Sequence, residues 1–431
     1  MDVQDGSNGK SIQVGGPEKP IHRLPEELLV YVFKIIIEYN LLGIGRLLFV
    51  SQYWYSVIQN TPSLWSRIRI APRISNDVIK YTQYAMVALV NSVDSLLDIT
   101  IDLRLYTNYL DERGDKVLRE FLSEPDEVGF GKIFQILVGN DGSSMARWRS
   151  LRVRIPELPF DLYFKPGSVI GRFIGGLRYP TPHLQSLSIH LNSADEHFPK
   201  VGGPLQDLRR LKRFTMDAGG HLGYFNYDPK NIEVLCFRLW GSTKVMAPFL
   251  NLRHLSVSSM PNHGITHEYD PVIVLPLLES LTFGVWGSLQ KSSPAKALSR
   301  KIHAPILDTL RLLHDKAILT MNEVTSFRHV RALDLLSQST RPDIVLDFIH
   351  KNLPDYTALT SLTVCPWHLE GVMNGLRSLR DQGRAPMHFG TTYTIVSDNE
   401  GTLLDQSTMN RVVIMGRLSS EYLYRSHSLS G

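Results

Sequence analysis

The 431-residue chain has only two cysteines, Cys236 and Cys365, too few for the disulfide framework of a small secreted domain. It contains no N-x-S/T sequon for N-linked glycosylation. No segment reaches the ~18 consecutive apolar residues that a membrane-spanning helix needs, and residues 1–20 lack the apolar centre of a signal peptide. These absences predict an intracellular protein, cytoplasmic or nuclear, whose polar, glycine-rich residues 1–20 form a disordered tail.

A strong excess of charge is also missing. The chain has 46 basic and 42 acidic residues, a net charge of +4, and no dense basic tract. We therefore expect neither nucleic acid nor a membrane surface as a partner.

Sequence motifs for catalysis and cofactor binding are absent too. The chain has no G-x-x-x-x-G-K-S/T or G-x-G-x-x-G loop, no H-E-x-x-H or C-x-x-C and no G-x-S-x-G. Its 15 histidines are scattered singly. We therefore predict no catalytic residue, no metal and no cofactor, and hence a protein that is not an enzyme. An enzyme hidden in an α/β fold is the least favoured alternative.

Residues 21–70 carry enough apolar side chains for a small unit of packed helices. Pro25, Glu26 and Glu27 are typical of a first helical turn, and apolar residues then recur at three- and four-residue steps up to residue 39. A second helix is expected from residue 44 to residue 58, followed by a short turn with Leu64 and Trp65. Because about 50 residues is near the lower limit for an independent core, we expect this unit to pack against another protein on one side and the rest of the chain on the other.

This stretch resembles the F-box. The resemblance rests on LPEELL at 24–29, VF at 32–33, VS at 50–51 followed by Trp54, and TPSLW at 61–65. Two departures are Ser51, where cysteine is common, and the region 43–45, where many F-boxes carry acidic residues. The resemblance implies docking to a Skp-type adaptor, which links F-box proteins to a cullin–RING ubiquitin ligase. The alternative is an ordinary helical pair that caps the domain after it. The residues to which the resemblance assigns adaptor binding are Leu24, Pro25, Leu28, Leu29, Val32, Phe33, Val50, Trp54, Leu64 and Trp65.

Beyond residue 90 a short phrase recurs nine times, with an apolar centre and apolar residues three positions before and two positions after it. Eight of the nine centres are leucine, and seven of the eight intervals between them are 20–29 residues, the length of a leucine-rich repeat. The alternation predicts a short strand with one apolar side, and stacking such strands in parallel buries that side. The nine centres are Leu151, Leu187, Phe214, Leu235, Leu255, Leu281, Leu310, Leu333 and Leu362.

The fold prediction is therefore α/β: a short helical F-box at 21–70, then an irregular leucine-rich-repeat solenoid at 71–366 with a parallel sheet on its concave face. Residues 367–431 are expected to cap the solenoid. We expect a helix at 75–92 and further strands at 68–70, 96–105, 393–397 and 412–416. An F-box followed by irregular units of this kind resembles the large fungal set of F-box proteins with degenerate leucine-rich repeats.

The residue after each centre should point away from the core, onto the concave face. These residues are mostly small and polar, which suits a protein or peptide partner; a solvated face without a ligand is the alternative. The residues assigned to substrate binding are Arg152, Ser188, Thr215, Arg238, Ser256, Thr282, Arg311 and Asp334. The resemblance implies a substrate-recruiting subunit of an SCF-type ubiquitin ligase, with a Skp-type adaptor, a cullin behind it and a protein target. The alternative is an interaction scaffold that engages no ubiquitin ligase.

Overall fold

The structure is a computed structural model of the chain. It describes residues 24–39, 43–72, 75–103, 124–155, 177, 179–191, 208–216, 227–239, 243–259, 271–285, 300–313, 318, 326–336, 342–365, 368–384, 389–397 and 410–416. The predicted tail at 1–20 lies outside these residues.

Four short helices form the amino-terminal part: α1 (Glu26–Tyr39), α2 (Gly43–Leu47), α3 (Gln52–Gln59) and α4 (Pro62–Trp65). α1 carries two glutamates in its first turn, where they interact favourably with the helix dipole. The prediction of one helix across 44–58 was wrong, because α2 and α3 are separate. Ser51 is extended, and its side chain accepts a hydrogen bond from the Trp54 N–H at 3.1 Å. α3 therefore begins with an N-cap of its own.

The rest of the described chain is dominated by a sheet of 13 strands in the order β1-β2-β3-β4-β5-β6-β7-β9-β11-β12-β13-β15-β14. Every neighbouring pair from β1 to β13 is parallel. The strands are β1 (Arg67–Ile70), β2 (Leu97–Asp102), β3 (Trp148–Ile155), β4 (Ser186–Leu191), β5 (Arg213–Met216), β6 (Val234–Leu239), β7 (His254–Ser259), β9 (Ser280–Val285), β11 (Thr309–Leu312), β12 (Ala332–Leu335), β13 (Ser361–Val364), β14 (Phe389–Ser397) and β15 (Asn410–Gly416). The parallel arrangement of the nine phrases is thus confirmed.

Two details of the sheet differ from a continuous parallel array. β15 pairs antiparallel with both β13 and β14, so the expected carboxy-terminal strands do extend the sheet, but β15 runs opposite to the others. Strands β8 (Ile273–Val274) and β10 (Ile302–His303) form a separate parallel pair.

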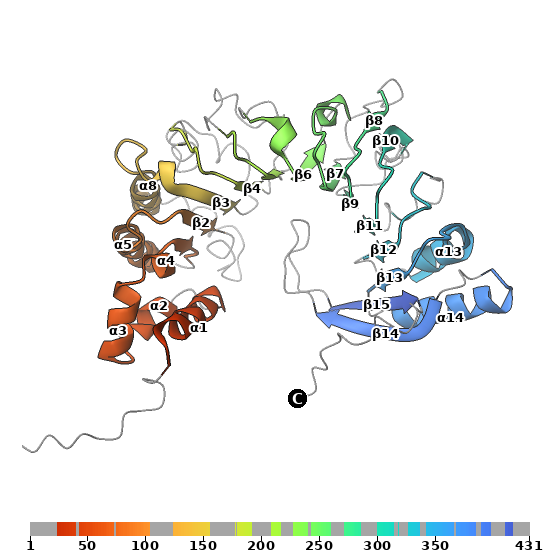
Figure 1. The fold of residues 1–431 in the computed structure, drawn as a ribbon, viewed down its shortest axis with the longest axis horizontal. Coiled ribbons are helices and arrows are strands. Elements are labelled where there is room, and N and C mark those ends of the chain that lie inside the picture. The colour runs from red at the N-terminus through yellow and green to blue at the C-terminus, as the bar shows by residue number, and fades with distance from the viewer. Residues whose placement is uncertain are drawn as a thin grey trace, which may run out of the picture.

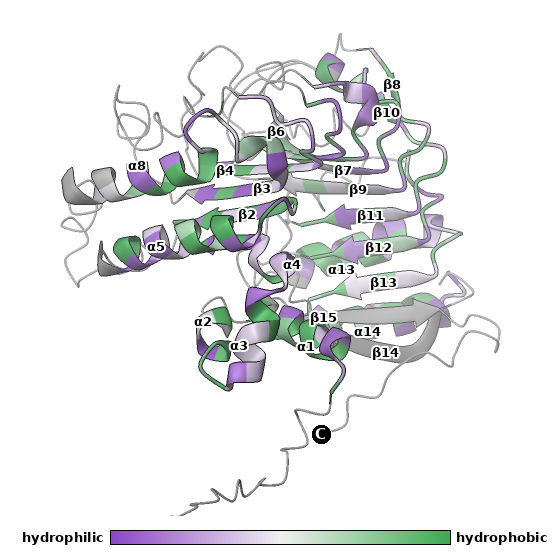
Figure 2. Cartoon of the chain, turned by 60° about the vertical axis from the view of Figure 1, so that its left-hand side comes forward, coloured by the Kyte–Doolittle hydropathy of each residue, from purple (hydrophilic) through white to green (hydrophobic). Residues whose placement is uncertain are grey.

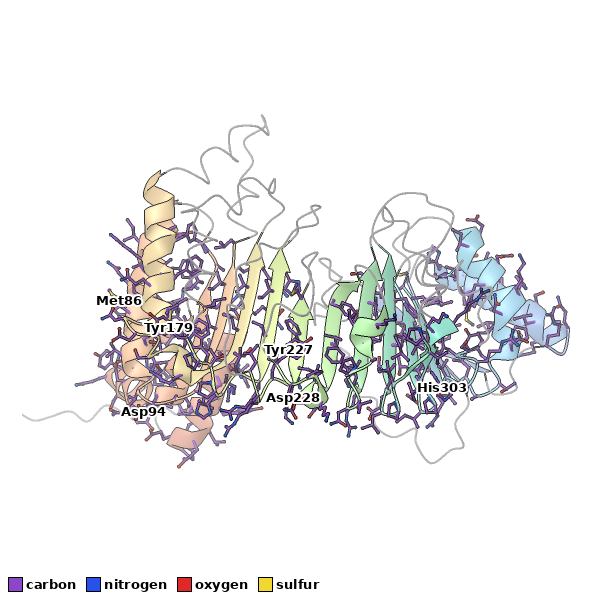
Figure 3. The ribbon with its side chains drawn as sticks, turned by 90° about the horizontal axis from the view of Figure 1, so that it is seen from above. Met86, Asp94, Tyr179, Tyr227, Asp228 and His303 are labelled. Atoms are coloured by element: carbon purple, nitrogen blue, oxygen red, sulfur yellow. The ribbon has the colours of Figure 1, made fainter. Side chains whose placement is uncertain are left out.

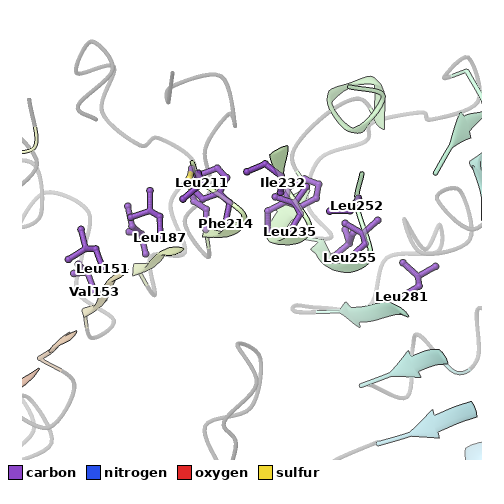
Figure 4. Packing of buried hydrophobic residues seen from close by; sticks show 14 of the residues in the cluster. Leu151, Val153, Leu187, Leu211, Phe214, Ile232, Leu235, Leu252, Leu255 and Leu281 are labelled. Atoms are coloured by element: carbon purple, nitrogen blue, oxygen red, sulfur yellow. The ribbon is translucent and has the colours of Figure 1, made fainter. Parts of the chain in front are cut away.

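The nine centres lie in one continuous row across the sheet. Leu151 pairs with Leu187, Leu187 with Phe214, and the register continues in step to Leu362 in β13. Every centre is 0–2% exposed, and Figure 4 shows side chains from successive strands on the same side of the sheet. Each short strand buries its leucine against the leucines of its neighbours, which explains why these strands form only as a stack.

The same turn precedes each strand of the row. The N–H of the residue three before the centre donates to the carbonyl of the residue six before it, as from Leu184 to Thr181 at 3.0 Å. The carbonyl two before the centre accepts N–H groups of the next unit, as Gln185 does from Lys212 and Arg213. These bonds join neighbouring units where the strands begin and satisfy backbone groups that would otherwise lack partners.

Aromatic rings pack against one another between neighbouring units. Tyr227 packs between Phe214 and Phe249, with ring centroids 5.4 and 6.0 Å away. Burial raises the pKa of Tyr227 to about 12, because the charged phenolate is disfavoured away from water. Figure 3 shows Tyr227 in the middle of the strand array.

The strands follow an arch, with helices on its outer side and the sheet on its inner, concave side (Figure 1). The outer helices are α5 (Ser75–Asn91), α8 (Glu124–Val138), α13 (Pro342–Asn352) and α14 (Leu369–Asp381). Short 3-10 turns occur at η2 (Met145–Arg147), η4 (Pro229–Asn231), η5 (Thr243–Met246) and η7 (Leu353–Asp355). Helices α1–α4 lie at one end of the arch and β14–β15 at the other. No helix among the described residues is long and apolar enough to cross a membrane.

Candidate functional site

The amino-terminal helices expose a group of large apolar side chains. Leu28 and Val32 lie one turn apart on α1, and Leu24 lies just before the helix; the exposed fractions of Leu24, Leu28 and Val32 are 37%, 53% and 39%. In the turn after α2, Phe49 is 90% and Val50 is 54% exposed. Gathered apolar side chains of this kind mark interaction sites, whereas scattered ones do not. We call this group the N-terminal apolar patch; its members are Leu24, Leu28, Tyr31, Val32, Ile35, Phe49 and Val50.

The hydropathy colouring of Figure 2 shows hydrophobic residues along α1 beside α2 and α3. α2 packs against α1, which brings the turn carrying Phe49 and Val50 towards the same small helical group. Pro25 is also exposed at the start of α1. Five of the ten residues assigned to adaptor binding therefore lie at the surface: Leu24, Pro25, Leu28, Val32 and Val50.

The other five assigned residues are buried within the chain itself. Leu29, Phe33, Trp54, Leu64 and Trp65 are each no more than 7% exposed. The Phe33 and Trp54 rings meet edge to face with centroids 4.9 Å apart, and the Trp65 indole N–H donates to the Ile58 carbonyl at 2.9 Å. These residues hold the helices in place and so shape the patch, but they do not contribute to its surface.

A family model described as F-box-like matches residues 21–71. The chain carries an F-box-like domain. No curated protein matches the chain. The domain consists of α1–α4 and extends into β1, and the N-terminal apolar patch is its exposed face.

The residues assigned to substrate binding form a second group, on the concave face of the sheet. Seven of them lie in a single row of the register, on every strand of this sheet from β3 to β12 except β6: Arg152, Ser188, Thr215, Ser256, Thr282, Arg311 and Asp334. Cys236 lies between Thr215 and Ser256 in this row. Arg238 occupies the next position of β6, opposite Ser258.

The row differs along its length in exposure and charge. Arg152 is exposed, whereas Ser188, Thr215 and Asp334 are 6–8% exposed. The Arg311 guanidinium lies 2.8 Å from the Asp334 carboxylate and compensates its charge. On β4, Ser188 Oγ and His190 Nε2 are hydrogen-bonded at 2.8 Å.

Sequence reasoning missed the two arginines that β1 contributes to this face. Arg67 and Arg69 lie on β1, where Arg69 is opposite Thr100 of β2, and Thr100 is opposite Arg152 of β3. The alternation in the tetrapeptide RIRI, with both isoleucines buried, was the available signal. Placing Arg69 in the same row as Arg152 also requires the register between β1 and β2. The recurring leucine phrase does not include these two strands, so it could not give that register.

Charged pairs also link the units where the strands begin. Lys212 and Glu233 are 2.8 Å apart, and Arg253 pairs with Glu279. The hydrogen bond from Lys212 holds the pKa of Glu233 below its usual value. Because these pairs are exposed, each contributes at most about 1 kcal/mol. Among the described residues, no three His, Cys, Asp or Glu side chains are grouped for a metal ion.

Proposed function

We propose that this protein is a substrate-recruiting subunit of a cullin–RING ubiquitin ligase and binds a Skp-type adaptor through its F-box-like domain. F-box domains generally bind adaptors of this type. The observation that carries the proposal is the N-terminal apolar patch, because Leu28, Val32 and Val50 expose 53%, 39% and 54% of their surface on the matched domain. Covering such side chains is favourable in proportion to the apolar area removed from water.

We further infer that β3 to β13 form an irregular leucine-rich-repeat solenoid, in a domain of residues 71–366 that residues 367–431 cap. The support is the continuous row of centres from Leu151 to Leu362 and the 20–29-residue spacing of most units. In this proposal the protein is intracellular and non-catalytic, and it resembles the fungal F-box proteins with degenerate repeats. Its target would bind the concave face through the row that runs from Arg152 to Asp334.

A scaffold without a ubiquitin ligase is the second candidate. One hydrophobic core is continuous from Leu29 in α1 to Leu379 in α14, so the F-box-like helices also close one end of the sheet core. That role alone would explain Leu29, Phe33 and Trp65. It leaves the exposed members of the N-terminal apolar patch without a purpose, and for that reason we favour the adaptor.

Co-purification of the full chain with a co-expressed Skp-type adaptor tests the proposal. Leu24→Ala with Pro25→Ala removes two exposed side chains and should abolish co-purification. Pro276→Ala with Leu277→Ala is a matched control, because this exposed proline–leucine pair includes a leucine that is 39% exposed, against 37% for Leu24. If the wild-type chain retains no adaptor, or if the Leu24 and Pro25 variant retains it fully, the proposed docking surface is refuted.

A further inference from the structure

Among the described positions from β1 to β13, the concave face carries a net charge only at the end near the F-box-like domain. In the five strands nearest the F-box-like domain, β1–β5, its described positions include five arginines: Arg67, Arg69, Arg152, Arg154 and Arg213. The same positions hold two acidic residues, Asp98 and Asp102, and no lysine. From β7 to β13, the Lys, Arg, Asp and Glu residues at the described positions of the face are Arg311 and Asp334, and these two form an ion pair.

The two acidic residues do not neutralise this end. Asp102 is 3.6 Å from Arg154 and is nearly buried, and Asp98 is bonded to Arg149 at the start of β3. Subtracting the two carboxylates from the five arginines leaves a charge of +3 on the described face of β1–β5. A surface of one sign attracts a partner of the opposite sign and raises its association rate.

Arg69 supplies a more specific sign of a ligand. Its side chain is half-buried, and its Nε atom is buried without a hydrogen-bond partner among the described residues. A buried donor without an acceptor is costly, and more so on a charged group. An anionic oxygen delivered by a partner would satisfy this atom. Guanidinium groups suit that role because their N–H groups form a planar fork that matches a carboxylate.

We propose that this arginine-rich half of the concave face binds an extended acidic segment of the target protein. The proposal rests on the proposed function, in which the target occupies the concave face. Arg69 and Arg152 lie two strands apart in the same row, which corresponds to about 10 Å. An extended peptide presents side chains on one face every ~6.8 Å, so carboxylates at alternate positions can reach successive arginines.

The spacing favours this occupant over two others. A single phosphate group needs arginines that converge on one point, but these are distributed over β1, β3 and β5. A single-stranded nucleic acid is usually held by aromatic side chains that stack on its bases. The concave positions of β1–β6 that the structure describes contain no phenylalanine, tyrosine or tryptophan.

Fluorescence anisotropy of the full chain with a short fluorescein-labelled peptide, with glutamate at every second position, tests the proposal. The peptide should bind, and its affinity should fall as the NaCl concentration is raised. A peptide with glutamine in place of glutamate should not bind. Arg69→Gln with Arg152→Gln should weaken binding about tenfold or more. Arg328→Gln with Lys351→Gln is the control, because it removes the same charge from two exposed pairs elsewhere and should change affinity less than about twofold.

The proposal is overturned if the glutamine peptide binds as tightly, or if the control variant loses as much affinity as the test variant. It is also overturned if a peptide with one phosphoserine and no glutamate, or a single-stranded RNA of the same length, binds more tightly than the glutamate peptide. Should the Arg69 and Arg152 variant not fold, Arg67→Gln with Arg213→Gln replaces it, since both side chains are exposed. Adaptor binding is measured on the same samples, so a wild-type chain that binds the adaptor but not the glutamate peptide refutes this inference alone.

Discussion

The N-terminal apolar patch predicts that adaptor affinity can be lowered without lowering the stability of the fold. The perturbation is Leu28→Gln with Val50→Thr. Both substitutions keep the size of the side chain and add a polar group, and glutamine remains a good helix former within α1. Leu28 and Val50 are 53% and 54% exposed, so neither substitution opens a cavity. Surface substitutions of this kind change the free energy of unfolding by no more than about 0.5 kcal/mol.

The exposed fractions set the expected loss of affinity. Burying a leucine or valine side chain completely contributes ~1.5–3 kcal/mol. About half of each side chain remains to be covered, so each contributes ~0.8–1.6 kcal/mol if the adaptor covers it. The two together correspond to a roughly 15- to 200-fold increase in Kd.

Titration calorimetry with the purified adaptor measures this change, and urea denaturation checks stability. The control is Ile306→Gln with Val272→Thr, because these residues are 51% and 61% exposed outside the F-box-like domain. The control should leave Kd within about twofold of the wild-type value. An unchanged Kd in the Leu28 and Val50 variant would show that the adaptor does not cover this surface. Equal losses in both double variants would show that apolar exposure in general, and not this patch, governs the affinity.

The strands could be predicted from the sequence because one physical rule determines them. A leucine with an apolar residue two positions later can form a strand with one apolar side, and only stacking buries that side. This reasoning located all nine centres from Leu151 to Leu362, and the sheet places them in a single register. The strands at 393–397 and 412–416 followed from the same alternation, but the reversal of β15 depends on a connection that the pattern does not encode.

Each repeat unit has one more regular position than the three apolar positions on which the prediction rested. A further position six before each centre supplies a carbonyl to the turn before the strand, and it holds buried residues such as Phe249, Leu275 and Phe327. Its residue type changes from one unit to the next, including Thr181 and Pro229. Because a backbone carbonyl does the bonding, side-chain identity is weakly constrained there, and the position escapes a search for leucine.

The candidate adaptor site was predicted only in outline. Apolar periodicity located α1 but could not separate Leu28, which is 53% exposed, from Leu29, which is buried. Both residues are leucine, and only packing against α3 and α4 distinguishes their environments. The split between α2 and α3 was missed because Ser51 was weighed as a departure from the F-box pattern and not as an N-cap.

Two further substitutions test how the repeat units are packed. Gly142 has φ +73°, and a Cβ there would lie 2.1 Å from the Tyr179 ring. Gly142→Ala should therefore lower the free energy of unfolding, measured by urea denaturation, by ~2–5 kcal/mol. The loss should be smaller in a Tyr179→Ala background, because only the backbone strain remains there. Burial raises the pKa of Tyr356 from 10.0 to about 12, so the neutral phenol stabilises the fold below pH 10 and this contribution disappears as the pH rises towards 12. Tyr356→Phe has no proton to lose, so between pH 9 and pH 12 its free energy of unfolding should fall by about 2–3 kcal/mol less than that of the wild type. Tyr84 and Tyr227, whose pKa values are also about 12, remain in the variant and keep part of the alkaline sensitivity. Identical pH profiles for the two proteins would mean that the Tyr356 hydroxyl reaches water in the folded state.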